Sequence, residues 1–353
     1  MSILVTGGAG FIGTNFILHW LAGGGERVIN LDKLTYAANA SNLSGLGPDK
    51  YRLIRGDIGD RALVSEILNK EKPRAIINFA AESHVDRSIH NPGEFIQTNV
   101  VGFFNLLESL RAYLALLNEE SKLAFRFLHV STDEVYGSLS PEAPPFTELS
   151  PYAPNSPYSA SKAASDHLVR AYRHTYGLPV ITTNCSNNYG PYQFPEKLIP
   201  LIIINALKGK LLPVYGDGRQ IRDWLHVNDH CRALALVLEQ GTLGETYNIG
   251  GQAEKSNLEV VETLCDLLDV LKPMNDGKSY RKLVAFVKDR PGHDRRYAIN
   301  PEKIRRELGF QPRYNFATGL KETARWYLNN SIWVQQVQSG DYLKWLETQY
   351  GEH

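Results

Sequence analysis

The sequence of 353 residues is poor in cysteine. It contains three, Cys185, Cys231 and Cys265, which lie far apart and form no Cys-x-x-Cys pair. Disulfide frameworks and structural zinc sites usually need several cysteines at close spacing, so neither is predicted. We therefore expect no metal and a reducing compartment.

Net charge and long apolar runs are missing as well. The 38 basic residues are balanced by 38 acidic ones, which argues against a general nucleic-acid or anionic-membrane surface. The most apolar later stretch, residues 198–207, contains Pro200 and Asn205 and is too short to span a bilayer. The N-terminus enters an apolar run at residues 3–5 without the basic segment of a signal peptide. We expect a cytoplasmic protein that binds neither nucleic acid nor membrane.

The first half of the sequence alternates short apolar runs with helical patterns. Strands are expected at residues 3–5, 28–31, 51–54, 75–78, 125–130 and 180–183. Helices are expected between them at about 12–21, 61–70, 94–118 and 158–176. This alternation predicts an α/β protein with a parallel sheet covered on both faces, a doubly wound fold of the Rossmann type.

Beyond about residue 185 the pattern becomes mixed. Short strands are expected at 213–215, 246–249 and 284–288, and helices at about 197–209, 227–240, 257–271 and 316–329. We interpret residues 1–185 as the Rossmann domain, with its sheet completed by later segments. Residues 186–353 are interpreted as a smaller, discontinuous α/β domain for the substrate.

A glycine-rich turn follows the first expected strand. The run Gly7-Gly8-Ala9-Gly10-Phe11-Ile12-Gly13 contains G-x-G-x-x-G and opens a helix, where a dinucleotide pyrophosphate can meet free N–H groups. Asp32 ends the second strand, 19 residues after Gly13. A carboxylate there can accept hydrogen bonds from an adenosine ribose and repels a 2′-phosphate, which favours NAD over NADP. The adjacent Lys33 tempers this preference, and a structural glycine turn with an incidental Asp is the alternative.

Small and polar residues also follow the next two strands, at the edge where such sheets bind ligands. Asp57-Ile58 comes after the third strand, and Phe79-Ala80-Ala81-Glu82-Ser83 comes after the fourth. Asp57 could hold an adenine amino group, and the two alanines let the backbone pass close to a cofactor. Each residue alone is explained equally well as a loop or packing residue.

The most informative residues are Thr132-Asp133-Glu134 and the pair Tyr158 and Lys162. Tyr158 and Lys162 are four positions apart, so on a helix the phenol and the ammonium share one face. A phenol near a fixed cation can act as a base towards a hydroxyl. The adjacent carboxylates add acid and base capacity that alcohol oxidation alone does not need. The combination predicts oxidation of an alcohol followed by proton chemistry on the ketone, whereas a surface pair and a solvated loop are the structural alternatives.

With these motifs identified, the sequence resembles the extended short-chain dehydrogenase/reductase family and, within it, the dTDP-glucose 4,6-dehydratases. The resemblance covers nearly the whole length and is carried by residues 6–13, 32–36, 80–88, 131–137, 158–162, 184–191, 222–224 and 289–293. The glycine turn and the Tyr-Lys motif are shared by the wider family. The pair Asp133-Glu134 and the run 184–191 are more specific.

The resemblance implies NAD as cofactor, dTDP-glucose as substrate and a redox-neutral reaction. In this reaction Tyr158 takes the proton of the 4-hydroxyl, Glu134 removes the proton on carbon 5, and Asp133 protonates the departing 6-hydroxyl; Thr132 and Lys162 assist Tyr158. The implied cofactor contacts are Gly7, Gly10, Phe11, Ile12, Gly13, Asp32, Lys33, Leu34, Thr35, Asp57, Ile58, Phe79, Ala80, Ala81, Ser83, Thr98, Tyr158, Lys162, Cys185 and Asn188. The implied substrate contacts are Ser83, His84, Thr132, Asn187, Glu196, Lys197, Leu198, Pro213, Tyr215, Arg222, Asn257, Asp289, Arg290 and His293.

The resemblance also implies a homodimer that pairs through two long helices, here residues 94–118 and 158–176. Five leucines on the first helix form an apolar stripe: Leu106, Leu107, Leu110, Leu114 and Leu117. This stripe can face a partner subunit or its own sheet, so the pattern leaves both orientations open.

Two other kinds of function stay open. A 4-epimerase, a decarboxylase or a dehydratase of another nucleotide sugar would share the fold, although an epimerase needs neither carboxylate of Asp133-Glu134. A non-catalytic NAD-binding regulator would be expected to have lost Tyr158, Lys162 or the carboxylates. The sequence does not itself distinguish thymine from uracil or guanine.

Overall fold

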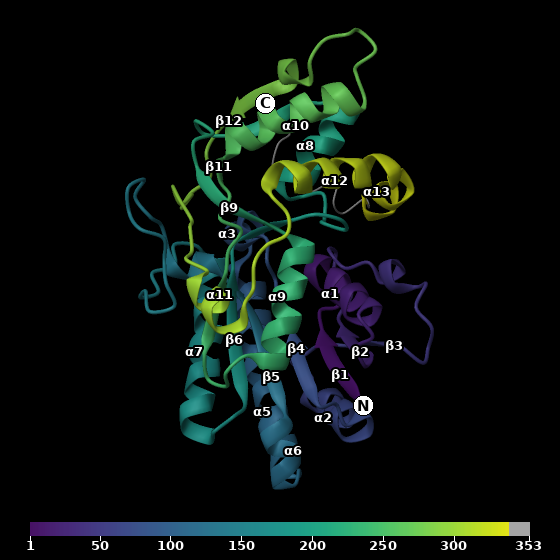
Figure 1. Ribbon diagram of the computed structural model, residues 1–353, viewed down its shortest axis with the longest axis vertical. Coiled ribbons are helices and arrows are strands. Elements are labelled where there is room, and N and C mark those ends of the chain that lie inside the picture. Colours follow the sequence, from purple (N-terminus) through teal and green to yellow (C-terminus); the bar gives the residue numbers. More distant parts are fainter. Residues whose placement is uncertain (339–353) are drawn as a thin grey trace.

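A parallel sheet of seven strands forms the lower part of the molecule, in the order β10-β6-β5-β4-β1-β2-β3 (Figure 1). The computed structural model describes residues 1–338. The strands are β1 (Ser2–Thr6), β2 (Arg27–Asp32), β3 (Tyr51–Arg55), β4 (Ala75–Asn78), β5 (Arg126–Thr132), β6 (Val180–Cys185) and β10 (Thr246–Ile249). The predicted α/β fold with a doubly wound parallel sheet is confirmed.

Helices cover both faces of this sheet. The covering helices are α1 (Phe11–Ala22), α9 (Val227–Gln240) and α11 (Glu302–Leu308) on one face, and α2 (Arg61–Glu71), α5 (Phe103–Ala115) and α7 (Pro157–Tyr176) on the other. Ile3 and Val5 of β1 face the first group, and Leu4 between them faces the second. The alternation follows from the strand geometry, because successive side chains point to opposite faces.

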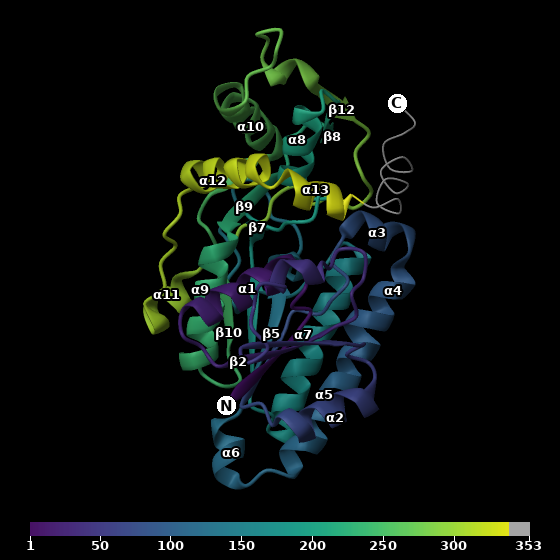
Figure 2. The same ribbon diagram turned by 90° about the vertical axis from the view of Figure 1, so that its right-hand side faces the viewer.

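Above the sheet lies a second region, which we call the upper lobe (Figure 2). It contains the sheet β11-β9-β7, the parallel pair β12-β8 and helices packed around a core of their own. Its elements are β7 (Asn187–Tyr189), β8 (Leu212–Tyr215), β9 (Ile221–His226), β11 (Glu254–Ser256), β12 (Val284–Val287), α8 (Leu198–Leu207), α10 (Asn257–Leu271), α12 (Phe316–Asn329) and α13 (Ser331–Val337). The chain passes between the two regions several times, since β10 and α9 belong to the large sheet and its covering layer.

The long helix expected after the fourth strand is interrupted. α4 (Pro92–Ile96) continues through a wide π-type segment, Gln97–Gly102, into α5. Leu106, Leu107 and Leu110 of the predicted stripe are fully buried in the core between α5 and the sheet. The stripe therefore faces its own sheet, which is one of the two orientations that the pattern allowed.

Several short elements were not predicted from the sequence. They are the helices α3 (Val85–His90), α6 (Glu119–Ala124), α11 and α13, the strands β7, β9 and β11, and the 3-10 turns Ala40–Leu43, Asp133–Tyr136 and Tyr280–Leu283. Within residues 1–338, no helix is both long and apolar enough to cross a membrane. The same part of the chain contains no cluster of three or more His, Cys, Asp or Glu suited to hold a metal ion. All three cysteines are buried free thiols.

Candidate active site

The turn between β1 and α1 brings two stretches of backbone into close contact. Gly7 has a φ of +71°, and a Cβ there would lie 2.6 Å from the nitrogen of Ala80. A Cβ on Gly13 would lie 2.4 Å from the carbonyl oxygen of Gly7. α1 begins after Gly10 without a side-chain cap, which leaves the helix N-terminus available to an anion. The turn therefore has the shape and polarity that a phosphate needs.

Main-chain groups hold the carboxylate of Asp32 at the end of β2. Its Oδ2 accepts a hydrogen bond from the Ala9 N–H and its Oδ1 accepts one from the Leu34 N–H, each at 2.8 Å. Burial raises the pKa of Asp32, and these two hydrogen bonds oppose the rise. The neighbouring Lys33 ammonium lies 2.9 Å from Asp57 Oδ2. The Lys33 ammonium is therefore paired with Asp57 and not with Asp32.

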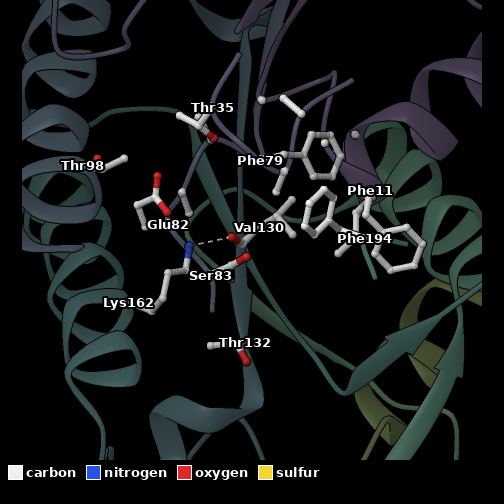
Figure 3. A pocket seen from close by; sticks show the side chains of 18 of the residues that line it. Phe11, Thr35, Phe79, Glu82, Ser83, Thr98, Val130, Thr132, Lys162 and Phe194 are labelled. Carbon is white, nitrogen blue, oxygen red and sulfur yellow. Dashed lines mark hydrogen bonds between the residues drawn. The ribbon is translucent and has the colours of Figure 1, made fainter. Parts of the chain in front are cut away.

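A cavity at the carboxyl ends of the strands gathers most of the predicted site (Figure 3). The five predicted catalytic residues line it, with seventeen further cofactor residues: Gly7, Gly10, Phe11, Ile12, Gly13, Asp32, Lys33, Thr35, Asp57, Ile58, Phe79, Ala80, Ala81, Ser83, Thr98, Cys185 and Asn188. Leu34 does not line the cavity and contributes through its N–H to Asp32. Asn187, Glu196 and Lys197 from the predicted substrate group line it too.

The two carboxylates follow directly from the end of β5. Thr132 is the last residue of the strand, and Asp133 and Glu134 begin the 3-10 turn. The Thr132 hydroxyl caps this turn by accepting a hydrogen bond from the Glu134 N–H at 3.3 Å. Asp133 is 2% exposed, and its Oδ2 has no hydrogen-bond partner among the described residues. A buried carboxyl oxygen without a donor favours the neutral acid.

The electrostatic surroundings of the two carboxyl groups differ. Burial raises the pKa of Asp133 well above its ordinary value, and the charges of Glu134 and Asp223 raise it further. Burial also raises the pKa of Glu134, but the nearby cations of Arg290, Arg222 and Lys197 oppose that rise. Asp133 is therefore suited to donate a proton and Glu134 to accept one.

Tyr158 and Lys162 lie on the first two turns of α7, as their spacing predicts. Pro157 is the first residue of this helix, and Ser156 and Ser159 form a reciprocal capping box at its start. The Lys162 ammonium donates a hydrogen bond of 2.9 Å to the Val130 carbonyl of β5 (Figure 3). This bond anchors the lysine at the strand that leads to the carboxylates.

Burial disfavours the charged forms of both Tyr158 and Lys162. It raises the pKa of the Tyr158 phenol well above the ordinary value, and the charge of Glu134 adds to the rise. Burial also lowers the pKa of Lys162. A further positive charge in the cavity would favour the phenolate of Tyr158.

A cluster of charged side chains connects the cavity to the upper lobe. Arg222 of β9 is 4% exposed, and its guanidinium lies 4.2 Å from the ring centre of Tyr297. Arg290, which follows β12, pairs with Asp86 of α3 at 2.9 Å. Tyr215 at the end of β8 donates a hydrogen bond of 3.2 Å to the same carboxylate. Two arginines thus lie near the catalytic carboxylates, where phosphate oxygens could pair with them.

His293 and Asp289 extend this cluster through a hydrogen bond between their side chains. The Nδ1 of His293 lies 2.6 Å from Oδ1 of Asp289. Burial and the charges of Arg290 and Arg222 lower the pKa of His293 to about 4. The imidazole is therefore neutral at pH 7 and can act there as a hydrogen-bonding group.

Four other predicted substrate residues lie outside the lining of the cavity. His84 caps the start of α3 and its Nε2 is 3.7 Å from Glu196, whereas Leu198 packs against the core of the upper lobe. Pro213 lies within β8, and Asn257 opens α10, where its N–H bonds to the Gln220 carbonyl.

The cavity also contains residues that the sequence reasoning missed. Glu82, Ser131, Ser186, Gln193 and Phe194 line it without having been proposed as contacts. Each lies within or beside a run already singled out, so adjacency to a motif was the available signal.

Comparison with known proteins identifies the family. The family model described as GDP-mannose 4,6 dehydratase matches residues 4–323. A dTDP-glucose 4,6-dehydratase of Xanthomonas campestris pv. campestris is 61% identical over 340 residues, which is 96% of each chain. The chain belongs to the 4,6-dehydratase family. This family is part of the extended short-chain dehydrogenases/reductases, as the sequence motifs predicted.

Solved structures related to this 4,6-dehydratase family share the fold. DesIV, a dTDP-glucose 4,6-dehydratase of Streptomyces venezuelae solved with NAD bound, has a TM-score of 0.86 and 48% identity, covering 96% of this chain and 100% of that one. A UDP-glucose 4-epimerase of Thermotoga maritima, solved with UDP-glucose, has a TM-score of 0.82 and 26% identity, covering 94% and 100%. Because dehydratase and epimerase share the architecture, the side chains of the site must distinguish them.

Proposed function

We propose that the protein converts dTDP-glucose to dTDP-4-keto-6-deoxyglucose and water. The observation that carries this proposal is the pair Asp133 and Glu134, which lines the cavity beside Tyr158. Burial and like charge favour a protonated Asp133, and neighbouring cations counteract the same effect at Glu134. An acid and a base on adjacent residues are what elimination of water across carbons 5 and 6 requires.

The residues of the chain divide the proton transfers among them. Tyr158, bonded through its phenol oxygen to the 4-hydroxyl, takes the proton of that hydroxyl as carbon 4 is oxidised. The resulting ketone acidifies the proton on carbon 5, which Glu134 removes, and Asp133 gives a proton to the departing 6-hydroxyl. Glu134 returns its proton to carbon 5 when a hydride is added at carbon 6. Thr132, at the end of β5, orients the 4-oxygen. At the end Tyr158 holds the proton of the 4-hydroxyl and Asp133 has lost one, so exchange of one proton with solvent at each residue restores the starting state.

NAD fits the cofactor side of the cavity. A Cβ at Gly7 or Gly13 would fill the cradle next to the helix N-terminus, and the buried Asp32 carboxylate lies where a 2′-phosphate would be repelled. NAD held there would supply the acceptor for the hydride of carbon 4 and, once reduced, the hydride for carbon 6. The positive charge of an oxidised nicotinamide ring would also favour the phenolate of Tyr158.

The charged cluster of the upper lobe fits the diphosphate of the substrate. Arg222 is buried and Arg290 is half-buried, and a pyrophosphate offers oxygens for both. Tyr215 and Pro213 on β8 would pack against the base. These roles, and those of Asn187, Asn257 and His293 as hydrogen-bonding groups, are part of the proposal.

A 4-epimerase is the second candidate, because a UDP-glucose 4-epimerase shares the fold. An epimerase returns the hydride to carbon 4 and needs neither an acid at carbon 6 nor a base at carbon 5. In an epimerase, burial of a second carboxyl group next to Glu134 would destabilise the fold by desolvation and would serve no step of the reaction. Asp133 therefore favours the dehydratase.

We also propose a homodimer that pairs through α4, α5 and α7. Because the leucine stripe packs against the sheet of its own subunit, the subunit interface would lie on the opposite side of these helices. Phe104 is 40% exposed, Ile96 is 47% exposed and Tyr176 is 52% exposed there. Apolar side chains at such exposure on neighbouring helices are typical of a subunit interface.

The division into a cofactor domain and a substrate domain stays a proposal. The cofactor domain would comprise residues 1–185 together with α9, β10 and α11, and the remainder of residues 186–353 would bind the nucleotide sugar. Three free, buried thiols support a reducing, cytoplasmic setting.

The direct test is incubation of the purified protein with dTDP-glucose and no added cofactor, followed by mass spectrometry. We expect loss of one water per sugar without net reduction of NAD. A product isomeric with the substrate would establish an epimerase instead. No product even with NAD supplied would reject dTDP-glucose as substrate, and UDP-, GDP- and CDP-sugars would be compared next.

A further inference from the structure

Asp166 lies one helical turn beyond Lys162, so Tyr158, Lys162 and Asp166 share one face of α7. All three are buried, with Asp166 5% and Lys162 4% exposed. We propose that Asp166 is the counter-ion that keeps the Lys162 ammonium charged within the site, and is thereby a positioning residue for the base Tyr158. This inference rests on the proposed function, because it concerns the first proton transfer of that reaction.

The carboxylate of Asp166 is held firmly by neutral groups. Its Oδ2 accepts hydrogen bonds from the Ser131 hydroxyl at 2.9 Å and from the Tyr152 phenol at 3.0 Å. Its Oδ1 lies 3.1 Å from Nε2 of His129. Neutral donors stabilise a carboxylate without cancelling its charge, so the negative charge of Asp166 is available to act on another group.

His129 is not the cation that balances Asp166. Burial lowers the pKa of this imidazole to about 4, and the charge of Lys162 contributes to the lowering. The Nδ1 of His129 lies 3.3 Å from the Asn78 amide, and its ring lies 4.4 Å from the ring centre of Phe103. The imidazole is therefore neutral at pH 7, and Lys162 is left as the neighbouring cation on this face of α7.

The surroundings of Lys162 contain little else that favours its charge. Its hydrogen-bond acceptor, the Val130 carbonyl, is neutral. Cys185 on β6 stays a thiol, because burial raises the pKa of its sulfur. Burial lowers the pKa of Lys162, and the largest opposing effect comes from Asp166. A buried ammonium without a counter-ion loses its proton readily.

The other ionisable groups on elements around α7 act mainly elsewhere. Asp86 pairs with Arg290, Glu196 lies beside His84 and Arg87, and Glu108 pairs with Arg111. Asp133 and Glu134 act on Tyr158, whose pKa they raise further than burial alone does, and the pKa of Glu82 is raised by burial and by Glu94 and lowered by Arg87 and Lys33. Asp166 therefore has a specific effect on Lys162, which those groups do not duplicate.

The test is the pH profile of the first step in Asp166→Asn, which keeps the size of the side chain and removes its charge. Reduced cofactor is followed by absorbance in a single turnover with dTDP-glucose, because this step uses Tyr158 and Lys162 but not the acid Asp133. Without Asp166 the pKa of Lys162 falls further, so the alkaline limb of the profile moves to lower pH by about one to two units.

Two matched variants separate charge from structure. Tyr152→Phe removes one hydrogen bond to Asp166 and no charge, so its alkaline limb stays at the wild-type pH. Asp166→Glu restores the charge and should return the limb towards that pH. If Asp166→Asn does not yield folded protein, Asp166→Ser is measured in the same way, since it leaves room for water in a polar site.

The outcomes are distinguishable. The role of Asp166 as counter-ion is supported if the alkaline limb of the pH profile moves in Asp166→Asn or Asp166→Ser. The limb must at the same time stay at the wild-type pH in Tyr152→Phe and return towards it in Asp166→Glu. The proposal is overturned if the pH profile of Asp166→Asn superimposes on that of the wild type. It is also overturned if the alkaline limb of Tyr152→Phe shifts as far as that of Asp166→Asn. If the wild-type protein forms no reduced cofactor with dTDP-glucose while it binds NAD, the proposed function fails, and the role of Asp166 in it fails as well.

Discussion

The cofactor side and the upper-lobe side of the site are built differently. On the cofactor side the shape comes from backbone: the Gly7 turn touches the chain at Ala80, and main-chain N–H groups hold Asp32. On the other side the groups are long charged side chains, and Arg290 meets Asp86 across 204 positions of the chain. A backbone cradle has little freedom, whereas arginines can change partners as a ligand enters. The difference suits a cofactor that stays bound and a substrate that is exchanged.

The largest effect is expected at Glu134, which lies between the cofactor side and the upper-lobe side of the site and is the proposed base. Glu134→Gln keeps the shape and loses the base, so product formation should fall by about 10²–10⁴-fold. Oxidation of carbon 4 does not use Glu134, and reduced cofactor should accumulate on the enzyme, visible by absorbance. Glu120→Gln on the exposed helix α6 is the control. Dehydration at the wild-type rate would show that Glu134 is not the base.

The second change tests the backbone cradle. Gly7→Ala introduces a Cβ 2.6 Å from the Ala80 nitrogen at a φ of +71°. We expect the NAD content of the purified protein to fall by about tenfold or more, because steric overlap is added to backbone strain of about 1–3 kcal/mol. Gly24→Ala is a matched control, with a φ of +80° and no neighbour within 4 Å. Equal loss of NAD in both variants would argue against a specific cradle.

The third change tests the arginine side. Arg290→Gln removes a charge that we assign to the diphosphate and leaves Asp86 with the Tyr215 hydroxyl but without its guanidinium partner. The KM for dTDP-glucose should rise about 10- to 100-fold, as expected for a charge-assisted hydrogen bond of about 1.5–3 kcal/mol. The NAD content should stay unchanged, because the change is confined to the substrate side. Arg295→Gln, which breaks an exposed pair with Asp217, is the control; a similar KM in both variants would contradict the assignment.

The smallest effect is expected at Lys33. Its side chain is 59% exposed and its pair with Asp57 lies at the surface, where such pairs are worth less than about 1 kcal/mol. Lys33→Met should therefore change NAD binding by only a few-fold, measured by titration calorimetry on the cofactor-free protein. A large loss of NAD affinity would mean that an exposed charge, and not the backbone cradle, holds the cofactor.

The strands and helices around the cofactor could be predicted because their signals are local. Short stretches of sequence are enough to recognise the glycine-rich run from Gly7 to Gly13 and the end of the second strand at Asp32. β9 was not predicted, although it carries Arg222, since its six residues include Arg222, Asp223 and His226 and lack the continuous apolar run typical of the large sheet. The importance of Asp166 also escaped prediction, because its spacing from Lys162 gains meaning only when Ser131, Tyr152 and His129 are known to surround it. The assigned roles of the site residues stay predictions.

The sequence by itself determined the fold class and the glycine-rich turn and predicted the catalytic residues, since each depends on residues close together in the chain. Parallel strands bring their carboxyl ends to one edge, so the sequential motifs necessarily meet there. Only the tertiary structure decided that the leucine stripe faces its own sheet and that Arg290 reaches Asp86. It also supplied a physical reason for the predicted roles of Asp133 and Glu134, because burial raises the pKa of both carboxyl groups and distant cations oppose the rise mainly at Glu134. Such effects depend on distances through space, which the spacing of residues along the chain does not specify.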